Sequence, residues 1–287
     1  MPEKTRTVST VLRPEDYEEP RCLLCETPGA RENPVRMVPQ QRIIQKLDDY
    51  MSRRDYAGAE RHLKYWLAEA ADGHDRRGEL MVRGELIGHY RKMGNRTAAL
   101  EQVDAALALL KELGFEETRS GGTTYVNAAT ACSAFGEHER AMGLFERARK
   151  VYEADEKTSP ELLGGLYNNM ALCCAALGRY KEASACYEKA LAVMDAVPGG
   201  ELEQAITWLN MADAAVAEKG MEESEGLIRE YLDKAFDLLT HTGAPRDGYY
   251  AFVCEKCAPV FSYYGYFLAA QELEETAKRI YEERGSV

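Results

Sequence analysis

The stretch NMALCCAALGRYKEASACYEKAL, from Asn169 to Leu191, contains two apolar helical patterns that are separated by Gly178. Glycines between paired helical patterns recur every 42 residues at Gly94, Gly136, Gly178 and Gly220, and Gly265 follows 45 residues later. An earlier turn is centred on Arg54, 40 residues before the first of them. A nearly constant period over this many units predicts a chain that is built from stacked helix pairs.

Alanines keep their places within the unit. Five residues after the turn come Ala59, Ala99, Ala141, Ala183 and Ala270. Twelve after it come Ala106, Ala148, Ala190 and Ala277, and seven before it come Ala129, Ala171 and Ala258. Because two antiparallel helices approach closely only where side chains are small, these alanines predict helix crossings. Glu225 breaks the pattern after Gly220, where we expect one inserted residue and a longer second helix.

This pattern resembles the tetratricopeptide repeat family over roughly residues 41 to 285, and most closely over the quoted stretch. The resemblance implies an all-α fold, a right-handed α-α superhelix of about six helix pairs. It also implies that the first helix of each pair lines a concave groove. The unit of 42 residues is longer than the family's usual length of about 34, so we expect longer helices and loops.

The chain of 287 residues is expected to have two parts. Residues 1–39 are rich in proline and charge, which predicts an extended or disordered arm that is a free tail or an internal ligand of the groove. Residues 40–287 are expected to form the repeat solenoid. Its units are predicted at approximately 41–73, 78–114, 121–156, 160–197, 201–241 and 248–285.

The charge balance disfavours two classes of partner. With 48 acidic against 36 basic residues the net charge is −12, which repels nucleic acid phosphates and anionic lipids. No stretch is apolar enough to span a membrane, and the N-terminus lacks the pattern of an export signal. We therefore expect a cytoplasmic protein that binds neither nucleic acid nor membrane.

Asparagines recur in the first helices of three consecutive units. They are Asn127, Asn169 and Asn210, with Asn168 one position before the second of them. Asparagine is unfavourable inside a helix, but its amide both donates and accepts hydrogen bonds. One amide per repeat could hold the main chain of an extended peptide, as in the asparagine ladders of several tetratricopeptide repeat proteins. Alternatively, the amides bond the neighbouring helix and stitch the repeats together.

Charged and aromatic residues flank this expected ladder. Glu85 occupies the corresponding position in the preceding unit and Lys256 in the following one, where opposite charges could orient a peptide. Tyr125 and Tyr167 each lie two residues before an asparagine, as does Trp208, and are expected near the peptide. The terminal unit is rich in aromatic residues and includes Tyr263, Tyr264 and Tyr266, which are core residues or a contact for a partner or a homodimer.

Two C-x-x-C pairs suggest a metal, although we expect no cofactor. A structural zinc prefers four thiolate ligands, and Cys22 with Cys25 is followed by a glycine turn, as in half of a zinc knuckle. Cys254 and Cys257 continue as a helix, so a shared four-cysteine site is disfavoured. The alternative to no cofactor is therefore a structural zinc at Cys22 and Cys25.

No nucleophile triad, phosphate-binding loop or metal-binding histidine pair is present in the sequence, so we do not expect an enzyme. The leading hypothesis is a peptide- or protein-binding adaptor that uses the asparagines in its groove. One alternative is a structural or assembly subunit that acts through its aromatic C-terminal repeat or as a homodimer. Another is a peptide-sensing regulator without a DNA-binding domain of its own.

Overall fold

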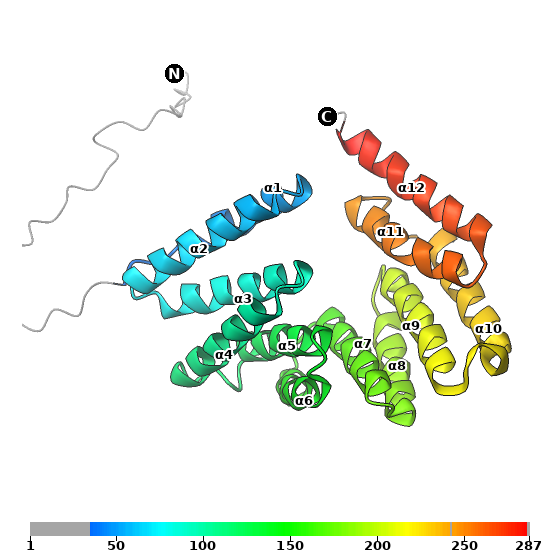
Figure 1. Cartoon of the computed structure of the whole chain (residues 1–287), viewed down its shortest axis with the longest axis horizontal. Coiled ribbons are helices and arrows are strands. Elements are labelled where there is room, and N and C mark those ends of the chain that lie inside the picture. Colours follow the sequence, from blue (N-terminus) through cyan, green and yellow to red (C-terminus); the bar gives the residue numbers. More distant parts are fainter. Residues whose placement is uncertain (1–34, 242, 286–287) are drawn as a thin grey trace, which may run out of the picture. The chain divides into compact units, whose positions relative to one another are not determined.

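A computed structural model describes residues 35–241 and 243–285, and over these residues the chain forms twelve helices and no strand. All twelve belong to one compact unit that begins at Arg36 (Figure 1). The first helices of the pairs are α1 (Gln40–Ser52), α3 (Arg76–Lys92), α5 (Arg119–Ala134), α7 (Pro160–Ala176), α9 (Glu201–Lys219) and α11 (Gly248–Tyr263). The second helices are α2 (Tyr56–Asp72), α4 (Arg96–Glu112), α6 (His138–Ala154), α8 (Tyr180–Asp195), α10 (Met221–Thr240) and α12 (Phe267–Gly285).

Each odd-numbered helix packs against the even-numbered helix that follows it. From α3 onward the odd-numbered helices also contact one another, α3 with α5, α5 with α7, α7 with α9, and α9 with α11. In a stack of helix pairs, the helices that approach each other in successive pairs lie on the inner side of the curve. The structure confirms the predicted all-α class and right-handed superhelix of six helix pairs.

The periodic turn residues share a positive φ, which explains why glycine recurs at these positions. Each of Arg54, Gly94, Gly136, Gly178, Gly220 and Gly265 has a positive φ, between 56° and 85°. Glycine enters this left-handed region without the steric cost that other residues carry. At Gly220 the demand is strictest, because α9 ends at Lys219 and α10 begins at Met221, so one residue connects the two helices.

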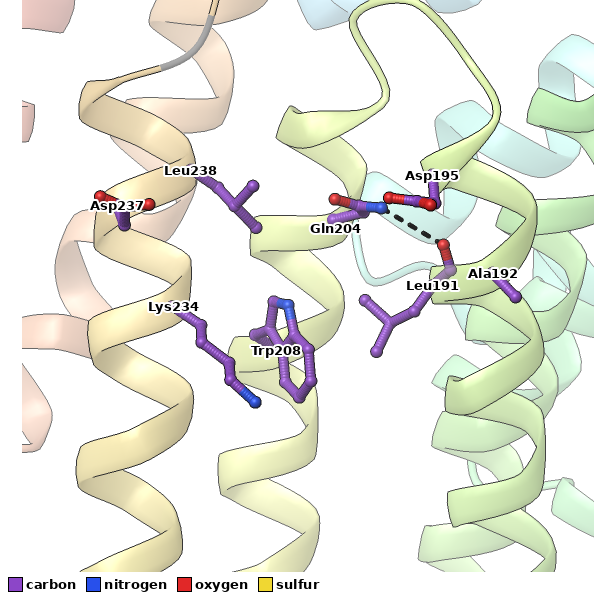
Figure 2. A pocket seen from close by; sticks show the side chains of 8 residues that line it. All are labelled: Leu191, Ala192, Asp195, Gln204, Trp208, Lys234, Asp237 and Leu238. Carbon is purple, nitrogen blue, oxygen red and sulfur yellow. Dashed lines mark hydrogen bonds between the residues drawn. The ribbon is translucent and has the colours of Figure 1, made fainter.

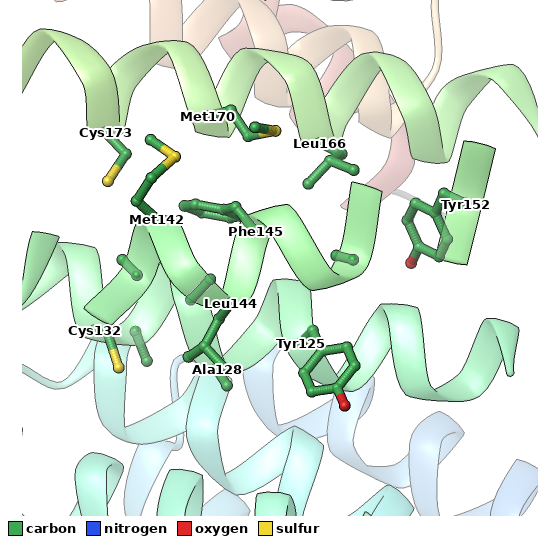
Figure 3. Packing of buried hydrophobic residues seen from close by; sticks show 14 of the residues in the cluster. Tyr125, Ala128, Cys132, Met142, Leu144, Phe145, Tyr152, Leu166, Met170 and Cys173 are labelled. Carbon is green, nitrogen blue, oxygen red and sulfur yellow. The ribbon is translucent and has the colours of Figure 1, made fainter. Parts of the chain in front are cut away.

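The alanines of the repeat are buried at the helix crossings, as the sequence predicts. Ala99, Ala141 and Ala148 are 0% exposed, and Ala171 and Ala258 are equally covered. Larger side chains fill the space beside them. Figure 3 shows Met142 and Phe145 of α6 packed beneath α7, with the α5 side chains below them. Because side chains of three consecutive helices interlock here, packing rather than helix propensity stabilises the stack.

In the α9–α10 pair, a different small residue lies at the helix crossing. Glu225 is exposed, and the buried small residue is Ser224, one position earlier. Its hydroxyl donates a hydrogen bond of 2.9 Å to the carbonyl oxygen of Ala215, which satisfies the buried polar group. The second helix of this pair has 20 residues, against 16 in α8, as expected for a longer helix.

The buried apolar side chains form three clusters along the stack. The N-terminal cluster draws on α1 to α4, the central one on α3 to α8, and the C-terminal one on α9 to α12. Met211 and Ala214 of α9 reach the central cluster only as half-buried neighbours. The change from the central to the C-terminal cluster therefore falls between α8 and α9.

Candidate functional site

A cavity of about 760 Å³ opens along the inner row of helices, between α3 and α5. We call it the inner cavity. Its apolar wall consists of Met37, Leu80, Met81 and Phe115. Its polar wall includes Glu85 and Asn127, two of the residues that the sequence analysis singled out. Met37 and Gln40, which were not among the predicted site residues, also line it from the segment around the start of α1.

Glu85 is a half-buried carboxylate on α3 for which the structure shows neither a hydrogen bond nor an ion pair among the described residues. Burial raises the pKa of its carboxyl group, and the neighbouring carboxylate of Asp48 raises the pKa further. Both effects disfavour the charged form of Glu85. Among the described residues, therefore, no cation stabilises this carboxylate.

Asn127 lines the same inner cavity as Glu85 and is also half-buried. Within the part of the chain that the structure describes, its amide makes no hydrogen bond to another residue. Gly84, on the facing helix, leaves room beside it, since a Cβ atom there would lie 3.6 Å from the Asn127 Nδ2. Asn127 thus presents a free donor and a free acceptor to the cavity.

The amides of the next two first helices are arranged differently. Asn210 Nδ2 donates a hydrogen bond of 3.2 Å to Asn168 Oδ1, which links α9 to α7. This is the stitching arrangement for that pair. Asn169 is half-buried and has no hydrogen-bond partner among the residues described. The inferred insertion aligned Asn210 with Asn169, whereas the hydrogen bond joins it to Asn168.

Tyr125 and Tyr167 lie away from the inner cavity. They are 4% and 8% exposed, and the Arg147 guanidinium lies 5.8 Å from the Tyr125 ring. The Tyr167 hydroxyl donates a 2.8 Å hydrogen bond to Glu153 of α6. Two residues along a helix are about 200° apart around its axis, so each tyrosine faces the second helices while the nearby asparagine faces the other way.

Trp208 lines a separate cavity of about 420 Å³ among α8, α9 and α10. Figure 2 shows its indole between the side chains of Leu191 and Lys234, whose ammonium lies 4.2 Å from the ring. Gln204 closes one side by donating a 3.3 Å hydrogen bond to the Leu191 carbonyl. The structure thus places Trp208 at the junction of α8 with α9 and not beside Asn127 or Glu85.

Lys256 is exposed on α11 and does not line the inner cavity. Its ammonium lies 5.8 Å from the Phe252 ring, which is an aromatic contact within the same helix. Of the two charged residues expected to flank the asparagines, only Glu85 shares a cavity with one of them.

The cysteines that the structure describes do not form a metal site. Burial raises the pKa of Cys254 to about 11 and that of Cys257 to about 12, so both remain protonated thiols at neutral pH. No group of three or more potential metal ligands occurs among the described residues. Cys22 and Cys25 lie outside those residues, and a zinc site there stays a prediction. In the described part, no helix is long and apolar enough to cross a membrane.

Known proteins share the repeat and its fold. A family model described as tetratricopeptide repeat matches residues 79–154 and 162–233. Crystal structures of BtubC (BKLC) from P. vanneervenii and of a putative kinesin light chain from Podosopora anserina are similar. The first is 19% identical with a TM-score of 0.59, covering 72% of this chain and 83% of that one. The second is 20% identical with a TM-score of 0.51, covering 75% and 99% respectively. No curated protein matches the sequence.

Proposed function

Because the chain belongs to the tetratricopeptide repeat family, whose members bind protein partners, we propose that it is an adaptor that holds an extended peptide along α3, α5 and α7. The observation that carries this proposal is the free amide of Asn127 in a cavity of about 760 Å³ on the inner helix row. An amide that is half-buried and unpaired gains a donor and an acceptor partner when a peptide main chain lies across it.

Asn169 supplies a second unpaired amide one repeat later. Repeats of a solenoid present equivalent residues at a regular spacing, so two such amides can contact the same extended strand. A strand that is held through its main chain can vary in sequence, and the walls of the cavity then determine which side chains fit. Asn168 is a poorer candidate for the first contact, since its Oδ1 already accepts a hydrogen bond from Asn210.

The proposal is tested by selection from a phage-displayed library of random linear peptides on the full chain. The Asn127→Ala/Asn169→Ala variant should bind the selected peptides about tenfold more weakly, since several net hydrogen bonds are lost. Gln271→Ala on α12 is the matched control for the loss of an amide and should bind like the wild-type chain. Selected peptides that bind the double variant with unchanged affinity would refute the role of the asparagines.

A second function is favoured by exposed apolar residues at the end of the stack. Tyr263, Phe267 and Leu268 are 69%, 67% and 84% exposed around the turn between α11 and α12. Tyr264 and Tyr266 are engaged within the chain, by a 2.7 Å hydrogen bond to Asp213 and by packing on Phe261. This patch suits contact with a second copy of the chain. Light scattering should show a dimer that dissociates on Tyr263→Ser/Phe267→Ser/Leu268→Ser substitution, and a wild-type monomer would exclude it.

A further inference from the structure

The lack of a counter-ion sets Glu85 apart from nearby acidic residues. Six residues earlier on α3, Glu79 is more deeply buried, but its carboxylate pairs with Arg76 and with Arg83, the latter at 2.7 Å. Glu137, half-buried at the start of α6, pairs with Arg96 and Arg140. Acidic side chains that are withdrawn from water normally have such partners. Within residues 35–241 and 243–285, Glu85 is withdrawn from water without such a partner.

The charged groups that the structure describes around Glu85 do not supply this cation. Arg77 lines the same cavity, but it precedes Glu85 by eight residues, which is about 12 Å along a helix. Its guanidinium is engaged 4.9 Å from the Phe115 ring. The other charge that acts on Glu85 is the carboxylate of Asp48, which is negative. The part of the cavity at Glu85 therefore favours a positive ligand group.

The inner cavity, which Glu85 lines, has the polar groups and the room that a positive ligand group needs. Asn127 offers its unpaired amide oxygen. Thr124 donates its hydroxyl hydrogen to the Ser120 carbonyl at 2.9 Å, so only oxygen lone pairs remain for a ligand. Gly84 adds no side chain to this wall, and among the described residues the only atom of another helix near the position that a Cβ would take is the Asn127 Nδ2, at 3.6 Å. The apolar wall can cover the methylene stem of a long side chain.

We propose that the inner cavity receives a lysine or arginine side chain of the bound peptide, with Glu85 as its counter-ion and Asn127 as an acceptor beside it. This rests on the proposed function, since it names the side chain that the peptide groove selects. Ammonium and guanidinium groups carry only donors, which match the carboxylate, amide and hydroxyl oxygens of this wall. Asn169 would hold the main chain further along.

The first experiment is the same peptide selection, with the selected sequences compared among three proteins. Wild-type chain should enrich lysine or arginine at one fixed position. Glu85→Gln should still enrich peptides but lose the basic position, and Glu85→Lys should replace it with aspartate or glutamate. Glu101→Gln is the matched control, since it removes an exposed acidic residue from α4, the partner helix of α3, and should leave the basic preference unchanged.

The second experiment measures coupling by fluorescence anisotropy with the best selected peptide. Replacing its basic residue by norleucine, which keeps the methylene stem, should weaken binding to wild type about tenfold or more. The same replacement should change the affinity for Glu85→Gln by less than about twofold. Acetylation of the peptide N-terminus should leave wild-type binding unchanged, because the proposed cation is a side chain. Circular dichroism verifies that each variant is folded.

The possible failures are distinguishable. Selection that enriches no peptide would overturn both proposals. Peptides that depend on Asn127 and Asn169 but show no basic position would overturn the role of Glu85 and leave the groove in place. A basic preference that persists in Glu85→Gln would also overturn it. Affinity that is lost on acetylation but not on norleucine replacement would assign the site to a peptide N-terminus instead.

Discussion

The α3–α5 and α7–α9 interfaces have polar residues at similar positions, but these residues are hydrogen-bonded to each other at only one of the two interfaces. At α7–α9, Asn168 and Asn210 lie 42 residues apart and their amides are hydrogen-bonded to each other. At α3–α5, Glu85 and Asn127 are also 42 residues apart and share a cavity, yet neither is bonded within the described chain. An asparagine in the inner row of helices therefore links two repeats when its amide is hydrogen-bonded to the neighbouring repeat. When it is not, the amide remains available to bind a ligand.

The largest expected effect tests what holds both interfaces together. Phe145, 1% exposed, lies in the core between them, and Phe145→Ala should destabilise the chain by about 3–5 kcal/mol through lost burial and a cavity. Urea denaturation followed by circular dichroism measures this change. A loss below about 1 kcal/mol would mean that polar contacts such as the Asn168–Asn210 bond, and not apolar packing, dominate the stability.

The next effect separates the two kinds of asparagine. Asn168→Ala should lower the free energy of unfolding by about 1 kcal/mol, because it breaks a partly buried hydrogen bond and leaves Asn210 without it. Asn127→Ala should leave the free energy unchanged or raise it by a few tenths of a kcal/mol, because alanine is the better helix former. Urea denaturation of the two variants, side by side, provides the comparison. An equal loss of unfolding free energy in the two variants would contradict the distinction between an asparagine that links repeats and one that is available to a ligand.

Gly84 provides a test of the open space in the α3–α5 interface. Gly84→Ala should raise the free energy of unfolding by about 0.5–1 kcal/mol, since a glycine inside a helix costs that much relative to alanine. Its new Cβ atom would lie 3.6 Å from the Asn127 Nδ2, an ordinary contact, so no clash offsets the gain. The variant should nevertheless bind selected peptides more weakly. Thermal denaturation measures the change in stability, and fluorescence anisotropy measures the change in peptide affinity. Unaltered affinity would mean that the peptide binds elsewhere.

The smallest effect concerns the charge of Glu85. Because the pKa of this carboxyl group is raised by burial and by Asp48, its ionised form costs stability at neutral pH. Glu85→Gln should therefore raise the melting temperature slightly at pH 7. The gain should disappear as the pH falls through the raised pKa to below the ordinary glutamate pKa of about 4.3, where wild-type Glu85 is protonated in both states. A gain that persists at low pH would show that charge is not its cause.

The repeat and its core could be predicted from the sequence because they depend on residue size and backbone conformation. Glycine at a left-handed turn and alanine at a helix crossing leave a periodic pattern that is visible without coordinates, as at Gly136 and Ala141. The sequence also indicates that Glu225 breaks the alanine pattern. It does not indicate that Ser224 would replace the alanine at the helix crossing. The single connecting residue at Gly220 moves the crossing by one position, and that connection is a tertiary detail.

The partners of the inner-row residues could not be predicted in the same way. Neighbouring residues on a helix point about 100° apart, so the choice between Asn168 and Asn169 as partner of Asn210 depends on the rotation of α9 against α7. The 42-residue period also gives no indication that Glu85 lacks a counter-ion, since that depends on where Arg77 and Asp48 lie. The positions of Tyr125 and Tyr167, by contrast, follow from the sequence. A residue two positions from an asparagine in a helix lies on a different face of that helix.

The change of core between α8 and α9 has a mechanical consequence. Three directional bonds cross this region, from Asn210 to Asn168, from Gln204 to the Leu191 carbonyl and from Tyr180 to the Ala217 carbonyl. Apolar packing tolerates small slippage, whereas a hydrogen bond weakens steeply with misalignment but exchanges with water at a net cost of about 1 kcal/mol. The position of α9 against α7 and α8 is thus held by directional bonds together with apolar packing, and the loss of one of these bonds would shift the register of the two halves of the array.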